Sequence, residues 1–184
     1  NVSGPVVVNY TISDGQGGTS SATLTINVGA NNPPTGADAS YTLAEDGSRS
    51  FTAADFGFAD SDFGQTLAAV RIDTLPSPSS LGTLTLSGTP VTAGQLIPVA
   101  QLANLVFTPA VDANGSPYAS FTFSVQDSAG AFDAAPNTVT LSVTPVNEAP
   151  VVSSTTISAT EAGAPVPLGL APPTDVDGDA LIIT

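Results

Sequence analysis

The sequence contains no cysteine, histidine, methionine or tryptophan, and its only basic side chains are Arg49 and Arg71. Without cysteine the chain forms no disulfide and offers no thiolate to a soft metal. Without histidine or cysteine, the usual nucleophile and base pairs of hydrolases cannot be built, and zinc lacks its common ligands. Two carboxylates can hydrolyse a glycoside, but the acidic residues here fall mostly in predicted loops and turns. We therefore expect no enzymatic activity.

The shortage of positive charge also limits the partners. Sixteen acidic side chains against two basic ones give a net charge of −14 at pH 7. Such a chain has no surface that could follow the phosphates of a nucleic acid or bind an anionic membrane. No stretch approaches the roughly 20 apolar residues of a membrane-spanning helix. Because 41% of the residues are hydrophobic and only 10% are charged, the chain can still bury a core.

Short stretches of alternating apolar and polar residues, separated by turn-forming residues, make up most of the chain. Residues 6–13 and 23–28 alternate in this way around the turn residues 14–18, which predicts a β-hairpin. A helical turn is expected at 99–105 and no other helix. About seven short strands in one domain are typical of a β-sandwich. The strands are expected at 41–43, 50–52, 67–72, 81–86, 105–107, 118–125 and 139–143. After this domain, residues 151–157 are expected to form a further strand, and an apolar run follows at 181–184.

The alternation also predicts which side chains the sandwich buries. Phe121, Phe123, Val125, Leu141 and Val143 lie on the apolar face of their strands and should be buried, whereas Thr122, Ser124 and Thr140 should be more exposed. Four further phenylalanines precede residue 67, and we expect them in the core. The alternative is an exposed aromatic platform for a glycan. They are Phe51, Phe56, Phe58 and Phe63.

The sequence repeats itself with a period of about 115 residues. Asn31 and Pro34 recur 116 positions later in residues 147–150, and the Asp60-Ser-Asp62 step recurs 115 positions later at 175–177. The step Glu45-Asp-Gly recurs at 161–163. Markers that keep their order and nearly the same offset indicate tandem repeats. We divide the chain into the end of one repeat at 1–30, a complete repeat at 31–148, and the start of another at 149–184.

The acidic residues gather near the boundaries of these repeats. Asp175, Asp177 and Asp179 alternate along five residues, and Asp60 and Asp62 do so along three. Alternating carboxylates in an extended loop can face one hard cation, and calcium takes about six to eight oxygen ligands. The alternative is a solvated acidic turn. A domain without disulfides also needs another source of stability, and a bound ion can supply it.

Two segments carry a resemblance to a known family. Residues 121–130 and 139–152 resemble the end of a cadherin-type repeat and its linker, and the Asp175-Val-Asp-Gly-Asp179 run resembles the D-x-D element of the same family. The chain is most similar to the bacterial cadherin-like tandem repeats of large surface adhesins and RTX-type secreted proteins. The resemblance implies an antiparallel Greek-key β-sandwich, cadherin-like or immunoglobulin-like, in tandem copies.

The resemblance further implies calcium at each junction between repeats. The family's linker usually has Asp after Asn, whereas this chain has Asn32 at one junction and Glu148 at the other. For Asp127, a simple Asx turn is an equally good interpretation. The ligands implied at the second junction are Glu45, Asp112, Asn147, Glu148, Asp175 and Asp177, with Asp179 as a further candidate. Those implied at the first junction are Asn31, Asn32, Asp60, Asp62 and Asp127.

From these features we expect an extender repeat of an extracellular adhesin, on a bacterial cell surface or secreted, made rigid by calcium (Ca2+) between repeats. Its partners would be neighbouring repeats of the same chain, and a host or surface glycan or protein reached through other domains. Two alternatives stay open. The sandwich could itself bind a glycan or protein, or incomplete repeats could self-associate into filaments by strand complementation.

Overall fold

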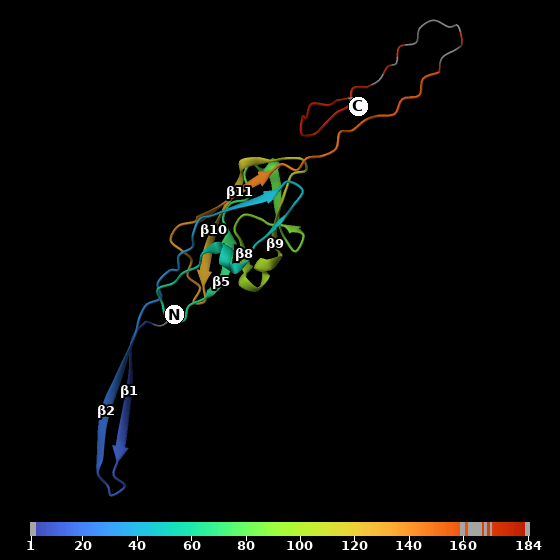
Figure 1. The fold of residues 1–184 in the computed structure, drawn as a ribbon. Coiled ribbons are helices and arrows are strands. Elements are labelled where there is room, and N and C mark those ends of the chain that lie inside the picture. Colours follow the sequence, from blue (N-terminus) through green and yellow to red (C-terminus); the bar gives the residue numbers. More distant parts are fainter. Residues whose placement is uncertain (1–2, 159–160, 162–166, 168, 170, 183–184) are drawn as a thin grey trace.

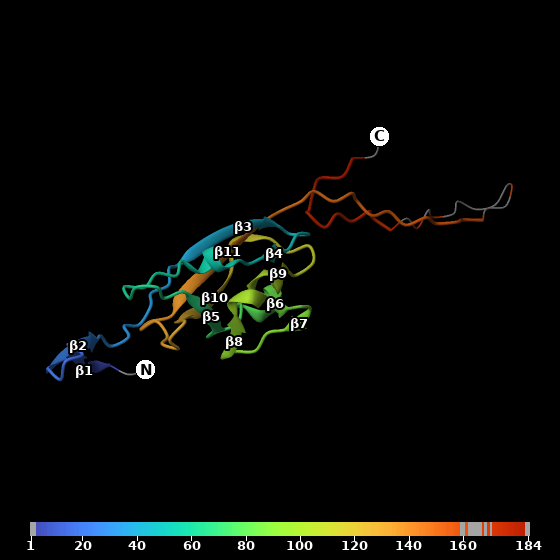
Figure 2. The same cartoon turned by 90° about the horizontal axis from the view of Figure 1, so that it is seen from below.

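The computed structural model describes residues 3–158, 161, 167, 169 and 171–182. The molecule is elongated, with an N-terminal hairpin at one end, a β-sandwich in the middle and an extended C-terminal segment at the opposite end (Figures 1 and 2). Parts of two sequence features, the repeat marker at 161–163 and the apolar run at 181–184, lie outside the described residues. Because the hairpin and the C-terminal segment lie at opposite ends of the sandwich, so do the first linker, which contains Asn31 and Asn32, and the second, which contains Asn147 and Glu148.

Two sheets form the sandwich and confirm the predicted all-β fold. Three 3-10 helices connect the strands: η1 (Ala53–Phe56), η2 (Ser79–Leu81) and η3 (Val99–Asn104). The sequence predicted η3 but neither η1 nor η2, and it missed β7 and β8. The five-stranded sheet has the order β3 (Ala39–Ala44), β11 (Asn137–Thr144), β10 (Gly115–Asp127), β5 (Leu67–Ile72) and β8 (Gln95–Pro98). The four-stranded sheet has the order β4 (Arg49–Ser50), β9 (Leu105–Pro109), β6 (Gly82–Leu86) and β7 (Thr89–Pro90).

The expectation of a wholly antiparallel sandwich is wrong for one pair of strands. β3 runs parallel to β11, with Ala39 opposite Val139 and Ala44 opposite Thr144. Both strands run from the first linker towards the second, because β3 opens the domain and β11 closes it. All other pairs within the two sheets are antiparallel. The strand by which the chain enters the sandwich is therefore hydrogen-bonded to the strand by which it leaves.

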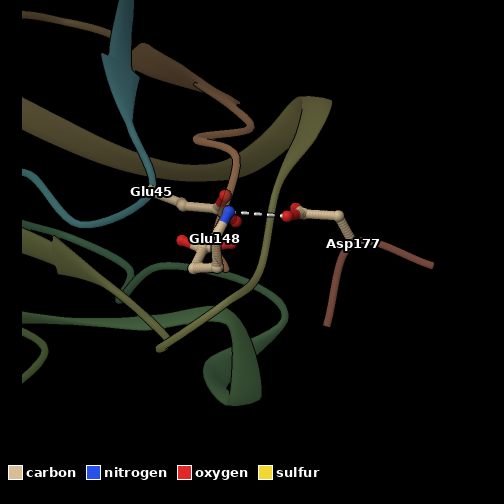
Figure 3. A group of neighbouring side chains, drawn as sticks. All are labelled: Glu45, Glu148 and Asp177. Carbon is tan, nitrogen blue, oxygen red and sulfur yellow. Dashed lines mark hydrogen bonds between the residues drawn. The ribbon is translucent and has the colours of Figure 1, made fainter. Parts of the chain in front are cut away.

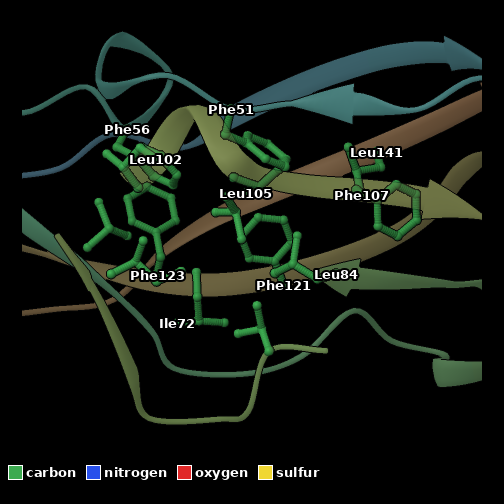
Figure 4. Packing of buried hydrophobic residues seen from close by; sticks show 14 of the residues in the cluster. Phe51, Phe56, Ile72, Leu84, Leu102, Leu105, Phe107, Phe121, Phe123 and Leu141 are labelled. Atoms are coloured by element: carbon green, nitrogen blue, oxygen red, sulfur yellow. The ribbon is translucent and has the colours of Figure 1, made fainter. Parts of the chain in front are cut away.

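Aromatic side chains fill the space between the sheets (Figure 4). The rings of Phe56 and Phe123 meet edge to face with centroids 4.9 Å apart, and Phe51 meets Phe121 in the same way at 5.7 Å. This confirms the core prediction for Phe51 and Phe56, and Phe58 packs against the core while partly buried. Phe63 is fully exposed and contradicts the prediction, because it lies in a loop outside both sheets.

The two strands at the centre of the five-stranded sheet largely follow the predicted pattern. Phe121, Phe123, Val125, Leu141 and Val143 are buried, as the alternation requires. Thr122 and Thr140 are partly exposed.

Ser124 departs from the pattern, since only 1% of it is exposed. Its hydroxyl donates a hydrogen bond to Asp73 Oδ2 at 2.7 Å and accepts one from Arg71 Nη2 at 3.1 Å. The long Arg71 side chain therefore covers this part of the outer face, which local alternation cannot reveal.

The N-terminal hairpin confirms its sequence prediction but lacks a core. β1 (Gly4–Ser13) and β2 (Thr19–Val28) pair in register over ten residues each. Every residue of β2 is exposed, and so are all those of β1 after Gly4. The apolar face of this ribbon contacts no second sheet among the described residues (Figure 1).

The strand expected at 151–157 does not form. Val151 makes one isolated bridge to Thr174, and residues 152–157 belong to no strand. β3, its counterpart in the complete repeat, is held as a strand by its ladder with β11. The described residues contain no strand that pairs with 152–157, and an extended segment without a ladder lacks the hydrogen bonds that define a strand.

Replacing Phe123 by alanine should destabilise the sandwich strongly. The substitution removes a fully buried ring and its edge-to-face contact with Phe56, and such changes cost about 3–5 kcal/mol. Phe63→Ala is the matched control, because its ring is exposed and its loss should change stability by less than about 0.5 kcal/mol. Urea unfolding followed by circular dichroism measures both. Equal losses in the two variants would contradict the assigned core.

Candidate metal centre

Three hydrogen bonds hold the second linker against the C-terminal segment, and a fourth lies within that segment. Val151 and Thr174 exchange two backbone bonds, and the backbone N–H of Glu148 donates to Asp177 Oδ2 at 2.8 Å. The N–H of Asp177 donates in turn to Asp175 Oδ1 at 3.0 Å. These contacts bring a loop 29 residues further along the chain onto the linker.

Three carboxylates meet at this place. Glu45, Glu148 and Asp177 each place one oxygen within 4.8 Å of the others (Figure 3). Glu45 directly follows β3, Glu148 lies in the linker, and Asp177 comes from the C-terminal segment. A second group of Asp46, Asp112 and Glu148 meets the same distance condition and shares Glu148 with the first. Glu148 is therefore the centre of five acidic side chains.

Glu45 is fixed in its orientation by the domain. Its side chain is buried, and its Oε1 accepts a hydrogen bond from the backbone N–H of Val146 at 2.6 Å. Its Oε2 accepts a bond from Asn114 Nδ2 at 3.2 Å. Because both oxygens are bonded, the Glu45 carboxyl group is held in place beside the linker.

The carboxylate of Glu148, unlike that of Glu45, accepts no hydrogen bond. Both of its carboxylate oxygens are buried from solvent and have no hydrogen-bond partner. Burial, followed by the negative charges of Asp177, Glu45 and Asp46, raises the pKa of Glu148 to about 7. An ionised carboxylate in such a position is unfavourable unless an opposite charge lies beside it.

No basic side chain of the protein can supply that charge. The sequence contains only Arg49 and Arg71, and each already bonds a carboxylate of the sandwich. Arg49 contacts Asp55 at 2.6 Å and stacks on the ring of Tyr41, while Arg71 contacts Asp73 at 2.5 Å. The cluster at the second linker is therefore not balanced by any charge from within the chain.

The other residues implied at the second junction lie around the cluster without joining it closely. Asp175 uses Oδ1 to accept bonds from the N–H groups of Asp177 and Asp179, so one of its oxygens caps the loop. Asn147 donates its amide to the carbonyl of Glu148 at 3.1 Å, which leaves its side-chain oxygen free to act as a ligand. Asp179 and Asn147 line an open cavity together with Asp112 and Asp177.

Two residues of this site escaped the sequence analysis. Asp46 was visible in the repeated Glu45-Asp-Gly step, but only its neighbour Glu45 was assigned to the site. Asn114 orients Glu45 from the loop before β10, and no local pattern pointed to it.

The first linker also gathers its predicted residues, but it pairs them with each other. Asn32 donates from its backbone N–H to Asp62 Oδ2 at 2.6 Å and from its side-chain amide to Asp62 Oδ1 at 2.7 Å. Asn31 donates to Asp127 Oδ2 at 2.8 Å. Asp60 accepts a bond from the N–H of Asp62 through Oδ1, and its Oδ2 is buried without a partner. At the first linker, the side-chain amides of Asn31 and Asn32 therefore donate hydrogen bonds to the carboxylates.

Comparison with known families identifies the sandwich between these two linkers. A family model described as "Bacterial Ig domain" matches residues 31–142, which is more than half of the chain. The chain belongs to the bacterial Ig domain family. No curated protein matches it.

The match covers the strands from β3 to most of β11. It establishes an immunoglobulin-like repeat, which is broader than the cadherin-like family that the sequence resembles. Bacterial Ig domains are typically not catalytic and are often extracellular or exposed on the cell surface. Among the described residues, no helix is long and apolar enough to cross a membrane.

Asp127 of this bacterial Ig domain forms an Asx turn, which is one of the two roles that the sequence suggested for it. Its Oδ1 accepts bonds from the N–H groups of Ala129 and Ala131 at 2.9 and 2.8 Å. Asp14 makes the same turn with Gln16 and Gly18 in the hairpin, at the equivalent place of the repeat. Burial acts to raise the pKa of Asp127, but the bonds from Asn31 and the turn hold it below the usual value.

Asp127→Asn should weaken the domain in a pH-dependent way. The folded state lowers the pKa below the unfolded value of about 4. The ionised side chain therefore stabilises the fold above that pH, and this contribution is lost as the pH falls through the folded-state pKa. In chelator near pH 7 we expect the variant to lose about 1–3 kcal/mol, because its amide faces the donor of Asn31.

Urea unfolding of both proteins between pH 7 and pH 2.5 measures the effect. The difference between wild type and variant should shrink in the most acidic samples, where Asp127 is itself protonated. A difference that stays constant over the whole range would contradict the role of the ionised carboxylate.

Proposed function

We propose that this chain is a structural extender segment of an extracellular bacterial protein, without catalytic activity, in which a calcium ion at the second linker fixes one repeat to the next. The observation that carries the proposal is the Glu148 carboxylate, which is buried without a hydrogen-bond partner beside Glu45 and Asp177. Since the only two basic residues are bonded elsewhere, a positive charge that kept Glu148 ionised would come from outside the chain.

The ligand chemistry favours calcium over other metals. The candidate ligand atoms named at the second linker are oxygens of carboxylates and of the Asn147 side-chain amide. Softer metals prefer sulfur or imidazole, and the sequence has neither cysteine nor histidine. Calcium accepts irregular arrangements of about six to eight oxygens, whereas magnesium requires a near-octahedral set. Extracellular calcium modules bind at about 10⁻⁴ to 10⁻³ M, a concentration range reached outside cells.

The position of the ligands gives the ion a structural role. Glu45 belongs to the sandwich, Glu148 to the linker and Asp177 to the following segment (Figure 3). A bound divalent cation would supply the positive charge that lets these three carboxylates stay together. In its absence the carboxylates repel one another, and the repulsion is strong because Glu148 is shielded from water. The linker would then open and the segment beyond it would change direction.

The wider biological setting follows from the repeats. Junction contacts recur at both ends of the sandwich with the period of the sequence, as expected for one unit in a row of similar units. We propose that the row serves as the stalk of an adhesin, as the resemblance to bacterial cadherin-like repeats suggests. Recognition of a host or surface glycan or protein would then belong to other domains of the same chain.

Calcium should raise the melting temperature of the 184-residue chain, and Asp177→Asn should remove most of that increase. A ligand that binds only the folded state stabilises it by about 1.4 kcal/mol at ten times its Kd. Asp177 is the best test residue because Asp175 also caps the loop. Glu161→Gln is the matched control, since it removes one exposed carboxylate away from the linker.

Thermal unfolding with millimolar calcium and with chelator measures the effect for the three proteins. Hydrogen exchange adds a local measurement, because the backbone N–H of Glu148 bonds to Asp177 and should exchange more slowly with calcium. Identical melting curves in calcium and chelator for the wild type, without heat of binding in calorimetry, would overturn the calcium site.

A second candidate function rests on the exposed hairpin. Val6, Tyr10 and Leu24 are about half exposed, and both edges of the β1–β2 ribbon are open. In the complete repeat the corresponding strands β10 and β11 are flanked by β5 and β3. Strands of a second copy could add to the open edges in the same way and join chains into a filament.

Concentration dependence distinguishes this second function from the first. If copies pair through the hairpin, the amide hydrogens of β1 and β2 should become protected from exchange as the protein concentration rises, and sedimentation should show larger species. If the chain remains monomeric at all concentrations, with fast exchange in the hairpin and slow exchange in β10 and β11, filament formation is excluded.

A further inference from the structure

We infer that the residue at one linker position, occupied by Asn32 in the first linker and Glu148 in the second, determines whether a linker depends on a cation. The inference rests on the proposed calcium function of the second linker and adds a rule for which linkers use it. It predicts that this chain contains linkers of two kinds, one closed by its own hydrogen bonds and one closed by an ion.

The two linkers are built alike. In the first, Thr35 and Ala59 exchange two backbone hydrogen bonds, and in the second Val151 and Thr174 do the same. The backbone N–H of Asn32 donates to Asp62 Oδ2 at 2.6 Å, and the equivalent N–H of Glu148 donates to Asp177 Oδ2 at 2.8 Å.

Two further contacts complete the correspondence. The N–H of Asp62 bonds to Asp60 Oδ1 at 2.7 Å, as the N–H of Asp177 bonds to Asp175 Oδ1 at 3.0 Å. Asn31 and Asn147 each donate their side-chain amide to the carbonyl of the next residue. Each linker therefore places the side chain of its second residue beside an aspartate of the D-x-D loop.

The side chains at that place differ in chemistry. The amide of Asn32 donates a hydrogen bond to Asp62 Oδ1 at 2.7 Å, so both oxygens of Asp62 are bonded within the linker. Glu148 carries no donor, and its carboxylate instead lies within 4.8 Å of Asp177 with both oxygens unpartnered. An amide beside a carboxylate is attractive, whereas two ionised carboxylates repel.

The surrounding charges strengthen this difference. Glu45, Asp46 and Asp112 add three more carboxylates around Glu148. At the first linker, Asp60, Asp62 and Asp127 do not come together as a group of three, although all of them are described. Asn31 and Gln65 stand among them, with Asn31 bonded to Asp127 and Gln65 bonded to Asn31. One buried oxygen of Asp60 remains unpartnered there, against two of Glu148 at the second linker.

Exchanging the two residues tests the inference in the full 184-residue chain. Glu148→Asn gives the second linker the side chain of the first, and Asn32→Glu does the reverse. Calcium chloride is titrated into each protein by isothermal calorimetry, and the melting temperature is measured in calcium and in chelator. Glu161→Gln again controls for the loss of one negative charge, and circular dichroism verifies the fold of each variant.

We expect the wild type to bind one calcium ion, Glu148→Asn to lose at least tenfold in affinity, and Asn32→Glu to gain a second ion. In chelator, Glu148→Asn should melt at a higher temperature than the wild type, because it exchanges repulsion from Asp177 for a hydrogen bond. Asn32→Glu should melt at a lower temperature than the wild type in chelator and recover in calcium.

Two failures can be told apart. If the wild type binds no calcium, the proposed function is wrong. If the wild type binds calcium and Glu148→Asn binds it equally well, the proposed function stands and the inference is overturned. A gain of calcium binding by Asn32→Glu supports the inference independently of any loss of folding in the other variant, and the absence of that gain in a folded variant contradicts it.

Discussion

Charge balance is the constraint on which the arrangement at both ends of this molecule depends. Only two side chains of the sequence are positively charged, and both are bonded to aspartates within the sandwich. The carboxylates that gather at the linkers must therefore be separated, covered by amides or balanced from outside. The first linker covers them with Asn31 and Asn32, whereas the second brings Glu45, Glu148 and Asp177 together without such cover.

The packing of apolar side chains accounts for the fold of the sandwich without a bound ion. Its interior is a continuous apolar cluster in which the phenylalanine rings meet edge to face between the two sheets. In the proposed row of repeats, this separation would let the sandwich stay the same while its linkers differ. The packing of Phe51, Phe121 and Phe123 fixes the shape of the unit, and a few polar residues at its ends govern how it meets its neighbours.

The sequence revealed those parts of the fold that depend on local patterns. Alternation located β5, β10 and β11, and the resemblance to cadherin-like repeats assigned Glu148 and Asp177 to one junction. Ser124 was misjudged because its cover comes from Arg71 on a neighbouring strand, and Phe63 because its loop lies outside both sheets. β8 was missed because four residues ending in proline carry little alternation. Asn114 was missed because only the fold brings it to Glu45, and Asp46 because only the fold brings it to Glu148.

The parallel pairing of β3 with β11 has a mechanical consequence. The chain enters the domain through β3 at one end and leaves it through β11 at the other. In the proposed row of repeats, tension would therefore pull the two strands in opposite directions along their length. All the hydrogen bonds of this ladder then carry the load in shear and must yield together, instead of opening one after another as in a hairpin pulled from its ends. The two strands that lead directly to the linkers are thus also the ones best placed to resist being drawn apart.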